Sequence, residues 1–329
     1  MEETNKYLEP PKELGCIEDE PDERDHPFGA VAGVPPTDMP TREAGYDVEE
    51  KFGKLIDDFQ SSTLRCVTEG GTNDAEMTFR AGTNGKQTPH FSRKFVYPEI
   101  VADGGGAQPR DFYKFWKGTG LCEEELLPSF PVGIELSEAW ARARTILTKQ
   151  ILDNAEKWKC DEYLSIGSDN IDLVRQAIFE NAGCGGGYVG VNANMGHFVF
   201  FKGWGIHGGY FGYRVKDSYP PTDRWIIIKD GKWHLENQFG SEVRLFSLWT
   251  AKKNFPSEEN MNVDKNLLDT LYNLIFHRDP DEGAKTHLDM DLNLVLHAFE
   301  ESGEWKFWDG LIRFLKLMKK PFMIFGKKN

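Results

Sequence analysis

Three features that mark membrane, secreted or nucleic-acid-binding proteins are missing from this sequence of 329 residues. No run approaches the roughly 18 apolar residues that a membrane-spanning helix needs. The first residues have neither the basic start nor the apolar stretch of a secretory signal, so we expect no signal peptide and a cytoplasmic protein. Basic residues are also too few, because 39 Lys and Arg against 53 Asp and Glu leave a net charge of −14. Such a chain neutralises phosphate poorly, and we expect no nucleic-acid partner.

Cysteine is sparse as well. The odd number of cysteines leaves at least one thiol outside any intrachain disulfide, and reduced thiols are the simplest state. Their spacing includes neither a C-x-x-C pair nor that of a metal finger, so we expect no metal site and no other cofactor. The five cysteines are Cys16, Cys66, Cys122, Cys160 and Cys184.

The sequence has ample material for a packed core, with 39% apolar and 13% aromatic residues, and this excludes global disorder. Its acidity is unevenly placed. Residues 1–50 hold fifteen Asp and Glu against four Lys and Arg, a balance of −11, so the rest of the chain carries only −3. Because residues 1–45 are also rich in Pro, they predict an extended acidic arm.

Apolar spacing predicts helices in the half of the chain that follows. One begins at about residue 47 and includes apolar residues to Phe59, a second covers 137–158 with Ser137 as its cap, and a third covers about 168–182. Residues 188–206 and 210–219 are strand-like and are joined by a glycine-rich hairpin at 207–209. A further hairpin over 224–235 turns at Asp230-Gly231. Helical spacing returns from about Val263, so the order of elements predicts an α+β fold.

Cys66 is the first candidate for chemistry. A lone cysteine is more often a buried structural residue, but the polar surroundings QSSTLRCVTE argue against that reading. Gln60 lies six residues upstream, where its side-chain amide can point toward the thiol. An amide donor beside a thiolate can stabilise the oxyanion that forms when the thiolate attacks a carbonyl.

His197 is the best candidate for a base that activates this thiol. It begins a predicted strand, and Gly196 before it leaves the imidazole open to a cleft. Asp217 ends the next strand, so a hairpin brings it beside His197, where it can fix the tautomer of the ring. Taken alone, His197 would be a core residue and Asp217 a turn residue.

The separations in the sequence are the stronger argument. His197 lies 131 residues after Cys66 and Asp217 lies 151 residues after it, near the roughly 130–150 that is typical of papain-type enzymes. At this point the sequence resembles the papain-like cysteine peptidases, most closely the bacterial and phage type. The resemblance implies a fold of two subdomains over residues 46–250, one helical and one of antiparallel strands. It also implies that Gln60 forms the oxyanion hole and that Cys66 opens a helix.

Further strings extend the resemblance over roughly residues 14–235. LGCIEDEPDERDHPFG is similar to the segment that precedes the domain in bacterial and phage relatives, and FSRKFVY is similar to their second helix. Gly105 and Gly106 match the glycine pair that binds the substrate backbone, and we place Gly196 with them as a substrate-binding residue. GTGLCEEELLP implies a structural role for Cys122.

The sequence also departs from the family pattern. The C-G-S-C-W string is absent, with Val67 where an aromatic residue is usual. Gly70 and Gly71 interrupt the helix expected at Cys66, and each interior glycine costs roughly 1 kcal/mol relative to alanine, so we expect a frayed helix. Asp217 replaces the usual Asn, a change compatible with orienting the imidazole. Tyr219 stands where Trp is usual.

The two ends of the chain suggest partners. Residues 255–329 resemble a small helical module that is appended to bacterial surface and phage proteins. Their last stretch, 306–329, is basic and aromatic, with seven Lys and Arg against one Asp. Such a tail can lie on an anionic membrane, and it can equally dock onto a neighbouring subunit or its own domain. The acidic arm is either a pro-segment that covers the cleft or a tether into an assembly.

The sequence therefore predicts a thiol hydrolase, a cysteine peptidase that cleaves a peptide or protein substrate through a Cys66–His197–Asp217 triad. The alternative is a catalytically weak or inactive structural component of a phage virion, in its tail or baseplate, or of a bacterial surface assembly. In that case the protein is virion-associated, and its arm and module bind structural partners. A third reading keeps the Cys–His pair but transfers acyl groups, as an amidase or a transglutaminase does.

Overall fold

Two units make up the chain, residues Met1–Asn254 and residues Phe255–Asn329. The computed structural model describes residues 15–130, 136–191, 193, 196–236 and 242–255. The predicted helical module and its basic tail therefore lie outside the described residues, apart from Phe255. Within the described part of the chain, no helix is both long and apolar enough to cross a membrane.

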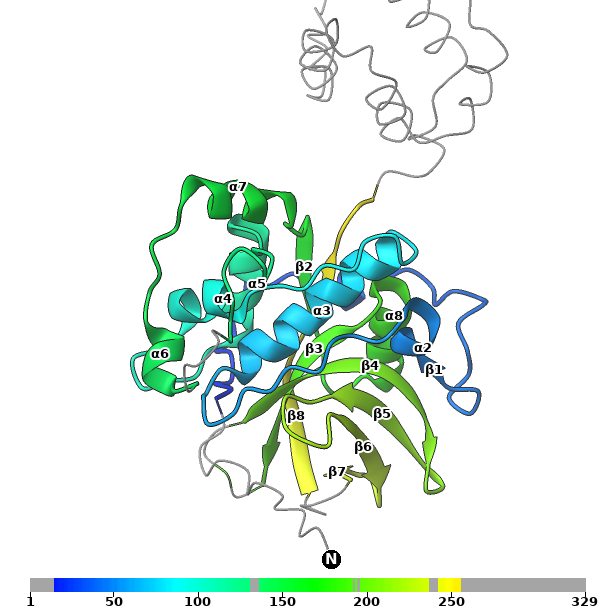
Figure 1. Cartoon of the computed structure of the whole chain (residues 1–329). Helices are drawn as coiled ribbons and strands as arrows, with labels where there is room; N and C mark the ends of the chain where they lie inside the picture. The colour runs from blue at the N-terminus through cyan, green and yellow to red at the C-terminus, as the bar shows by residue number, and fades with distance from the viewer. Residues whose placement is uncertain (1–14, 131–135, 192, 194–195, 237–241, 256–329) are drawn as a thin grey trace, which may run out of the picture. The chain divides into compact units, whose positions relative to one another are not determined.

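Helices form one half of the first unit. Figure 1 shows α4, α5, α6 and α7 gathered on one side of the longest helix, α3, with most of the strands on its other side. Helix α4 begins after Ser92, whose side chain accepts a hydrogen bond from Phe95 N, so the helix predicted from FSRKFVY is confirmed. The helices are α3 (Cys66–Gly82), α4 (Arg93–Ile100), α5 (Pro109–Gly118), α6 (Glu138–Arg142) and α7 (Lys149–Lys157).

Helix α3 runs unbroken through Gly70 and Gly71, so the expected fraying at these glycines is wrong. The physical reason is close packing on both sides of the helix. A Cβ at Gly70 would lie 2.7 Å from the ring of Phe198 in the sheet, and one at Gly71 would lie 2.6 Å from the ring of Phe112 in α5. The missing side chains let α3 press against both layers, and this packing offsets the low helix propensity of glycine.

Antiparallel strands form the other half. Six of them pair in the order β4-β3-β8-β7-β6-β5, and a further pairing of β4 with β5 closes the ring. The hairpin turns predicted at 207–209 and at Asp230-Gly231 are confirmed, since Gly208, Gly209, Asp230 and Gly231 all have positive φ. The strands are β1 (Tyr46–Asp47), β2 (Glu162–Ile166), β3 (Cys184–Gly190), β4 (His197–His207), β5 (Tyr210–Lys216), β6 (Asp223–Lys229), β7 (Lys232–Leu235) and β8 (Glu242–Lys252).

The arrangement of helices and strands confirms the α+β fold class. The stretch predicted as strand over 188–206 is two strands, β3 and β4, which pair with each other so that Tyr188 lies opposite His197. Helix α8 (Ile171–Asn181) packs on the sheet, where Val174 and Ile178 share a buried cluster with Phe200 and Trp204 of β4.

Two predicted helices are shorter than expected. The helix over 137–158 is broken into α6 and α7, although Ser137 caps α6 as predicted. The ammonium of Lys94, distant in sequence, donates to the carbonyls of Trp140 and Ala143, and these bonds end α6 at that point. Thr148 then caps α7 through Ile151 N.

Near residue 47, α2 (Val48–Phe52) ends at Gly53, whose φ of 98° lies outside the helical region, so the prediction of helix to Phe59 is wrong. The N–H of Leu55 does not continue the helix and donates to the side-chain carboxylate of Glu49. Helix α8 ends where expected, but it begins at Ile171 with Asn170 as its cap rather than at about residue 168. Within 15–45, the chain forms the short helix α1 (Phe28–Val31).

Candidate active site

Cys66 is the first residue of α3, and its side chain is fully buried. The N-terminus of a helix carries the positive end of the helix dipole, which favours a negative charge at that place. Arg65 precedes the thiol and lies 2.8 Å from the carboxylate of Glu69, one turn into the helix. The sequence therefore puts the one predicted nucleophile where a thiolate is best stabilised by the backbone.

His197 and Asp217 are brought together by the β4–β5 hairpin. His197 is the first residue of β4, and Asp217 directly follows β5, which pairs with β4 along its length. Nε2 of the imidazole lies 2.8 Å from Oδ1 of the carboxylate. The same oxygen accepts the N–H of Tyr219 at 2.9 Å, so two donors fix the carboxylate. Both side chains are almost completely buried.

The electrostatics of this pair favour an imidazolium. Burial opposes the charged ring, but the charge and hydrogen bond of Asp217, together with Cys66, outweigh burial and raise the pKa of His197 to about 10. Burial also disfavours the Asp217 carboxylate, yet His197 and then Arg224 hold the pKa of this group below its ordinary value. Each group thus stabilises the charged form of the other.

Cys66 also raises the pKa of the same ring. Because Nε2 is bonded to Asp217, Nδ1 is the nitrogen left to face the thiol. Nδ1 has no hydrogen-bond partner among the described residues. Catalytic hydrogen bonds are often long or poorly aligned in resting active sites and tighten when substrate binds.

Gln60 is buried beside this pair, but its amide is already bonded. Its Nε2 donates to Thr63 O and to the hydroxyl of Tyr219, both at 2.7 Å. Its carbonyl oxygen accepts the hydroxyl of Ser218 at 2.6 Å. The ring of Tyr219 also lies 5.4 Å from the ring of His197. Tyr219 therefore links the predicted oxyanion donor to the predicted base.

Gly105 and Gly106 form a turn of positive φ beside the nucleophile loop. Their backbone bonds inward: Gly105 N donates to Ala102 O, Gly106 O accepts from Ala102 N, and Gly106 N donates to the hydroxyl of Tyr97. The next residue, Ala107, has its N–H and C=O bonded to the segment around Cys16. Sequence reasoning did not single out Ala107.

A segment of the chain itself lies between Ala107 and Gly196, and we call residues Gly15–Glu20 the strap. Ala107 N donates to Gly15 O at 2.8 Å, and Ile17 N donates to Ala107 O at 3.0 Å. On the other side, Cys16 and Gly196 exchange both of their backbone hydrogen bonds, at 2.9 and 3.0 Å. The strap thus bridges the helical half and the residue that precedes His197 through backbone hydrogen bonds on both of its sides.

The strap also lies tightly against the loop that leads to the nucleophile. A Cβ at Gly15 would lie 1.8 Å from the backbone oxygen of Leu64, two residues before Cys66. A side chain at Gly15 is therefore incompatible with this position of the strap. With the strap in place, Cys66 and His197 are 0% and 1% exposed.

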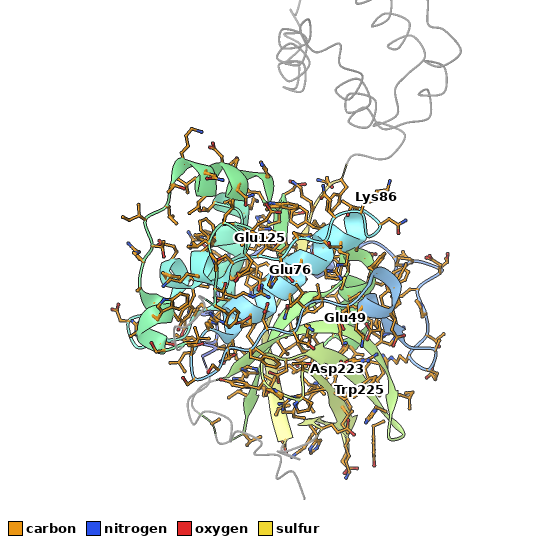
Figure 2. All side chains as sticks on the ribbon, in the orientation of Figure 1. Glu49, Glu76, Lys86, Glu125, Asp223 and Trp225 are labelled. Carbon is orange, nitrogen blue, oxygen red and sulfur yellow. The ribbon has the colours of Figure 1, made fainter. Side chains whose placement is uncertain are left out.

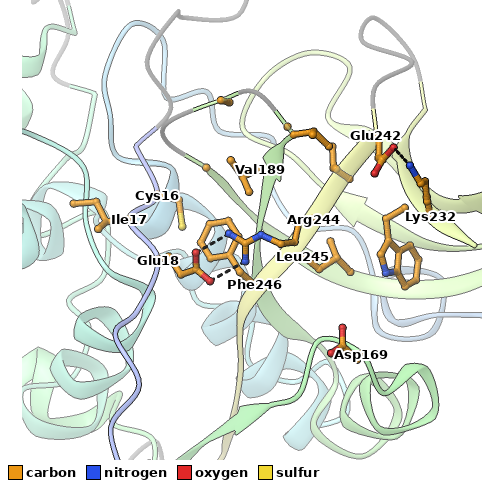
Figure 3. Close-up of a pocket in the computed structure, with 16 residues that line it drawn as sticks. Cys16, Ile17, Glu18, Asp169, Val189, Lys232, Glu242, Arg244, Leu245 and Phe246 are labelled. Carbon is orange, nitrogen blue, oxygen red and sulfur yellow. Dashed lines mark hydrogen bonds and ion pairs between the residues drawn. The ribbon is translucent and has the colours of Figure 1, made fainter.

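Carboxylates anchor the strap to β8. Glu18 makes a bidentate ion pair with Arg244, at 2.7 and 2.8 Å, which Figure 3 shows at the edge of a pocket. Asp19 is deeper: its carboxylate accepts the indole N–H of Trp249 at 2.8 Å, and its own N–H donates to Ser247 at 2.9 Å. Burial raises the pKa of Asp19, against the hydrogen bond from Trp249.

The pocket in Figure 3 has a volume of about 580 Å³ and borders both the strap and Gly196. Its walls are mostly apolar, and its edge carries the ion pairs of Arg244 with Glu18 and of Lys232 with Glu242. The lining residues are Cys16, Ile17, Glu18, Asp169, Val189, Gly190, Val191, Ala193, Gly196, Lys232, Trp233, Glu242, Val243, Arg244, Leu245 and Phe246.

Comparison with solved structures gives the fold. Xylellain, a cysteine protease from Xylella fastidiosa, superposes with a TM-score of 0.52 at 16% identity, over 74% of this chain and 96% of that chain. ProCathepsin B S9 from Trypanosoma congolense gives a TM-score of 0.50 at 13% identity, over 72% of this chain and 87% of that chain. The chain has a papain-like fold. No family model and no curated protein matches the sequence.

Within this papain-like fold, the structure places Cys66, His197, Asp217 and Gln60 in one buried cluster, and Gly196 at its edge. Gly105 and Gly106 lie close by, behind Ala107. Sequence reasoning did not find Arg224, whose contact with Asp217 depends on the pairing of β5 with β6. It also did not find the backbone pairing of Cys16 with Ala107 and Gly196. Each of these depends on contacts between distant segments, so no local signal marks them.

Proposed function

We propose that the protein is a thiol hydrolase that cleaves peptide bonds, with Cys66 as nucleophile and His197 as general base and acid. The observation that carries the proposal is the arrangement of three buried groups. Cys66 is the first residue of α3 and raises the pKa of His197, whose Nε2 is 2.8 Å from Asp217. The papain-like fold, shared with cysteine proteases, supports the same conclusion.

The chemistry follows from these positions. His197 accepts the proton of Cys66, and the thiolate sulfur bonds to the carbonyl carbon of the substrate. The C–N bond then breaks as His197 gives its proton to the leaving amine. In the second half, His197 takes a proton from water, the hydroxyl attacks the thioester carbon, and the sulfur leaves as a thiol.

The oxyanion requires donors beside Cys66. The backbone N–H of Cys66 at the start of α3 is one, and the amide of Gln60 is the other in this proposal. Since Nε2 of Gln60 donates to Thr63 O and Tyr219 in the resting state, it must exchange one of these acceptors for the oxyanion. Tyr219 lies at the surface of this cluster and is the acceptor that we expect to be exchanged.

Substrate recognition follows from the way the strap is held. Its backbone pairs with Ala107 and Gly196, so an extended peptide can use the same donors and acceptors once the strap has left. The apolar pocket beside Gly196, walled by Val189, Leu245 and Phe246, then receives an apolar side chain of the substrate. We infer that the described structure is a covered form of the enzyme.

The test is hydrolysis of fluorogenic peptides by a variant whose strap is displaced. Gly15→Val places side-chain atoms into the backbone of Leu64, so the strap cannot stay in place. Gly33→Val is the matched control, because nothing lies within 4 Å of a Cβ there. We expect cleavage by Gly15→Val that is lost when Cys66→Ser is added. Absence of cleavage from Gly15→Val across a peptide library would contradict the proposal.

A papain-like protein without catalysis is the second candidate. The observation that favours it is the resting state of Gln60, whose two amide N–H groups both have protein acceptors. Under this alternative, which the sequence predicted as a structural component of a phage or bacterial surface assembly, Gly15→Val exposes Cys66 without cleavage of any peptide. The same assay therefore separates the two candidates.

A further inference from the structure

Arg224 lies against the side of Asp217 that faces away from His197. It belongs to β6, opposite Val215 of β5, and only 3% of it is exposed. Its Nε is 3.2 Å from Oδ2 of Asp217. The mechanism above does not use this residue.

The guanidinium is held rigidly by the turn that follows Asp217. Its Nε donates to Pro221 O at 2.9 Å, and its Nη2 donates to Pro220 O at 2.9 Å and to Tyr219 O at 3.3 Å. Because these donors are directed at backbone carbonyls, Oδ2 of Asp217 receives no hydrogen bond within the described residues. Arg224 therefore acts on the carboxylate as a fixed charge rather than as a hydrogen-bond donor.

A carboxylate in this buried place needs such a charge. An unpaired buried charge is costly, and the imidazole offsets it only while it is protonated. During the proposed reaction His197 alternates between imidazolium and imidazole, whereas Arg224 keeps its charge throughout. The ion pairs of Asp217 within the described part of the chain are with His197 and Arg224.

We propose that Arg224 is a positioning residue of the active site: it keeps Asp217 ionised with Oδ1 turned to His197, and it offsets the carboxylate charge so that His197 can release its proton to the leaving amine. This role rests on the proposed function. It also explains how the site uses an aspartate, since Asp217 and Arg224 together are neutral, as an amide would be.

The groups around His197 set the sign of the expected effect. Cys66 of α3, Tyr188 of β3, Tyr219 and the Asp217–Arg224 pair are the titratable or charged groups that face the ring. If the positive charge of Arg224 is removed, the field of Asp217 at the ring is no longer offset. The imidazolium then persists to higher pH.

The first experiment follows the imidazole nitrogen resonances of His197 in the full-length protein from about pH 5 to about pH 12. We expect Arg224→Met to shift deprotonation of His197 upward by about one pH unit, and Arg224→Lys to stay close to the wild type. Arg214→Met, on the neighbouring strand and away from Asp217, is the matched control and leaves the titration unchanged. An unchanged titration in folded Arg224→Met overturns the proposal.

The second experiment uses peptide hydrolysis in the Gly15→Val background. We expect Arg224→Met to lower kcat about tenfold or more, and to lower it much less when Asp217→Asn is also present. An equal loss in both backgrounds means a merely structural role and overturns the proposal. If Arg224→Met alone does not fold, a folded Asp217→Asn/Arg224→Met double variant supports the proposal, and an unfolded one overturns it.

The two experiments distinguish failure of the proposed function from failure of the role of Arg224. Absence of hydrolysis in every variant removes the proposed function, while the titration of His197 still decides whether Arg224 sets the charge at the ring.

Discussion

The two sides of the active site hold their chemical groups in different ways. On the helical side, Cys66 is placed by the backbone of α3, which is pressed between β4 and α5 at two glycines. On the β side, His197 and Asp217 are placed by the register of β4 and β5 and act through their side chains. The nucleophile therefore depends on packing that cannot change without loss of stability, whereas the base depends on charges that single substitutions can change.

Buried ion pairs add to the rigidity of the helical side. Arg93 of α4 is fully buried and contacts Glu69, Glu76 and Asp58, at 3.0, 2.9 and 2.8 Å. Figure 2 labels Glu76 on α3. Asp58 lies two residues before Gln60, so this network ties the predicted oxyanion loop to the helix that carries Cys66.

The largest expected effect is therefore on the helical side. Arg93→Met leaves three carboxylates without their shared partner, and we expect the free energy of unfolding to fall by about 3–5 kcal/mol. Urea unfolding followed by circular dichroism measures this. Arg144→Met is the control, because Arg144 is 73% exposed and its ion pair lies at the surface. Similar losses of unfolding free energy in the two variants would contradict the claim that buried ion pairs make the helical side rigid.

On the β side, Asp217→Asn keeps a hydrogen-bond acceptor and removes the charge. Burial disfavours the imidazolium, but Asp217 outweighs it and raises the pKa of His197 to about 10, so we expect deprotonation about 1–3 units lower in the variant. Because this pKa lies above the ordinary value of 6.5, the imidazolium stabilises the fold fully below about pH 6.5. That stabilisation is lost as pH rises through about 10, and less so in Asp217→Asn.

Chemical unfolding at a series of pH values measures this linkage, and the imidazole resonances measure the titration. A stability profile of Asp217→Asn that falls with pH as steeply as the wild type would show that the carboxylate does not set the charge of His197.

A single methyl group tests the packing of α3. Gly71→Ala places a Cβ 2.6 Å from the ring of Phe112, so we expect a loss of about 1–3 kcal/mol in unfolding free energy. Gly118→Ala, at the end of α5 with nothing within 4 Å, is the control and should be neutral or slightly stabilising. Thermal unfolding distinguishes them. A neutral Gly71→Ala would mean that the helix can shift away from α5.

The smallest expected effect concerns the strap. Arg244→Met removes the exposed ion pair with Glu18, which is worth about 1 kcal/mol or less, so we expect Cys66 to be alkylated up to about fivefold faster. Lys232→Met removes the other ion pair at the edge of the same pocket without touching the strap. Equal rates of Cys66 alkylation in both variants would show that Arg244 does not help to keep Cys66 covered by the strap.

Local sequence signals predicted much of this molecule. Turn residues identified both hairpins, and the order of Gln60, Cys66, His197 and Asp217 identified a cluster that the structure brings together. The hairpin predictions are confirmed because each depends on a short segment, and the order of the site residues reflects a spacing that the fold preserves.

The errors come from contacts between distant segments. Gly70 and Gly71 read as helix breakers because their neighbours, Phe198 and Phe112, are far away in sequence. The break between α6 and α7 depends on hydrogen bonds from Lys94, which lies 46 residues before Trp140. None of these contacts leaves a local pattern.

The pH dependence of Cys66 alkylation by iodoacetamide, located by mass spectrometry in Gly15→Val, tests the central claim most directly. An activated Cys66–His197 pair predicts rapid labelling of Cys66 well below about pH 8, and its loss when His197→Ala is added. Equal labelling of Cys66 with and without His197, rising only at the ordinary titration of a free thiol, would contradict the account.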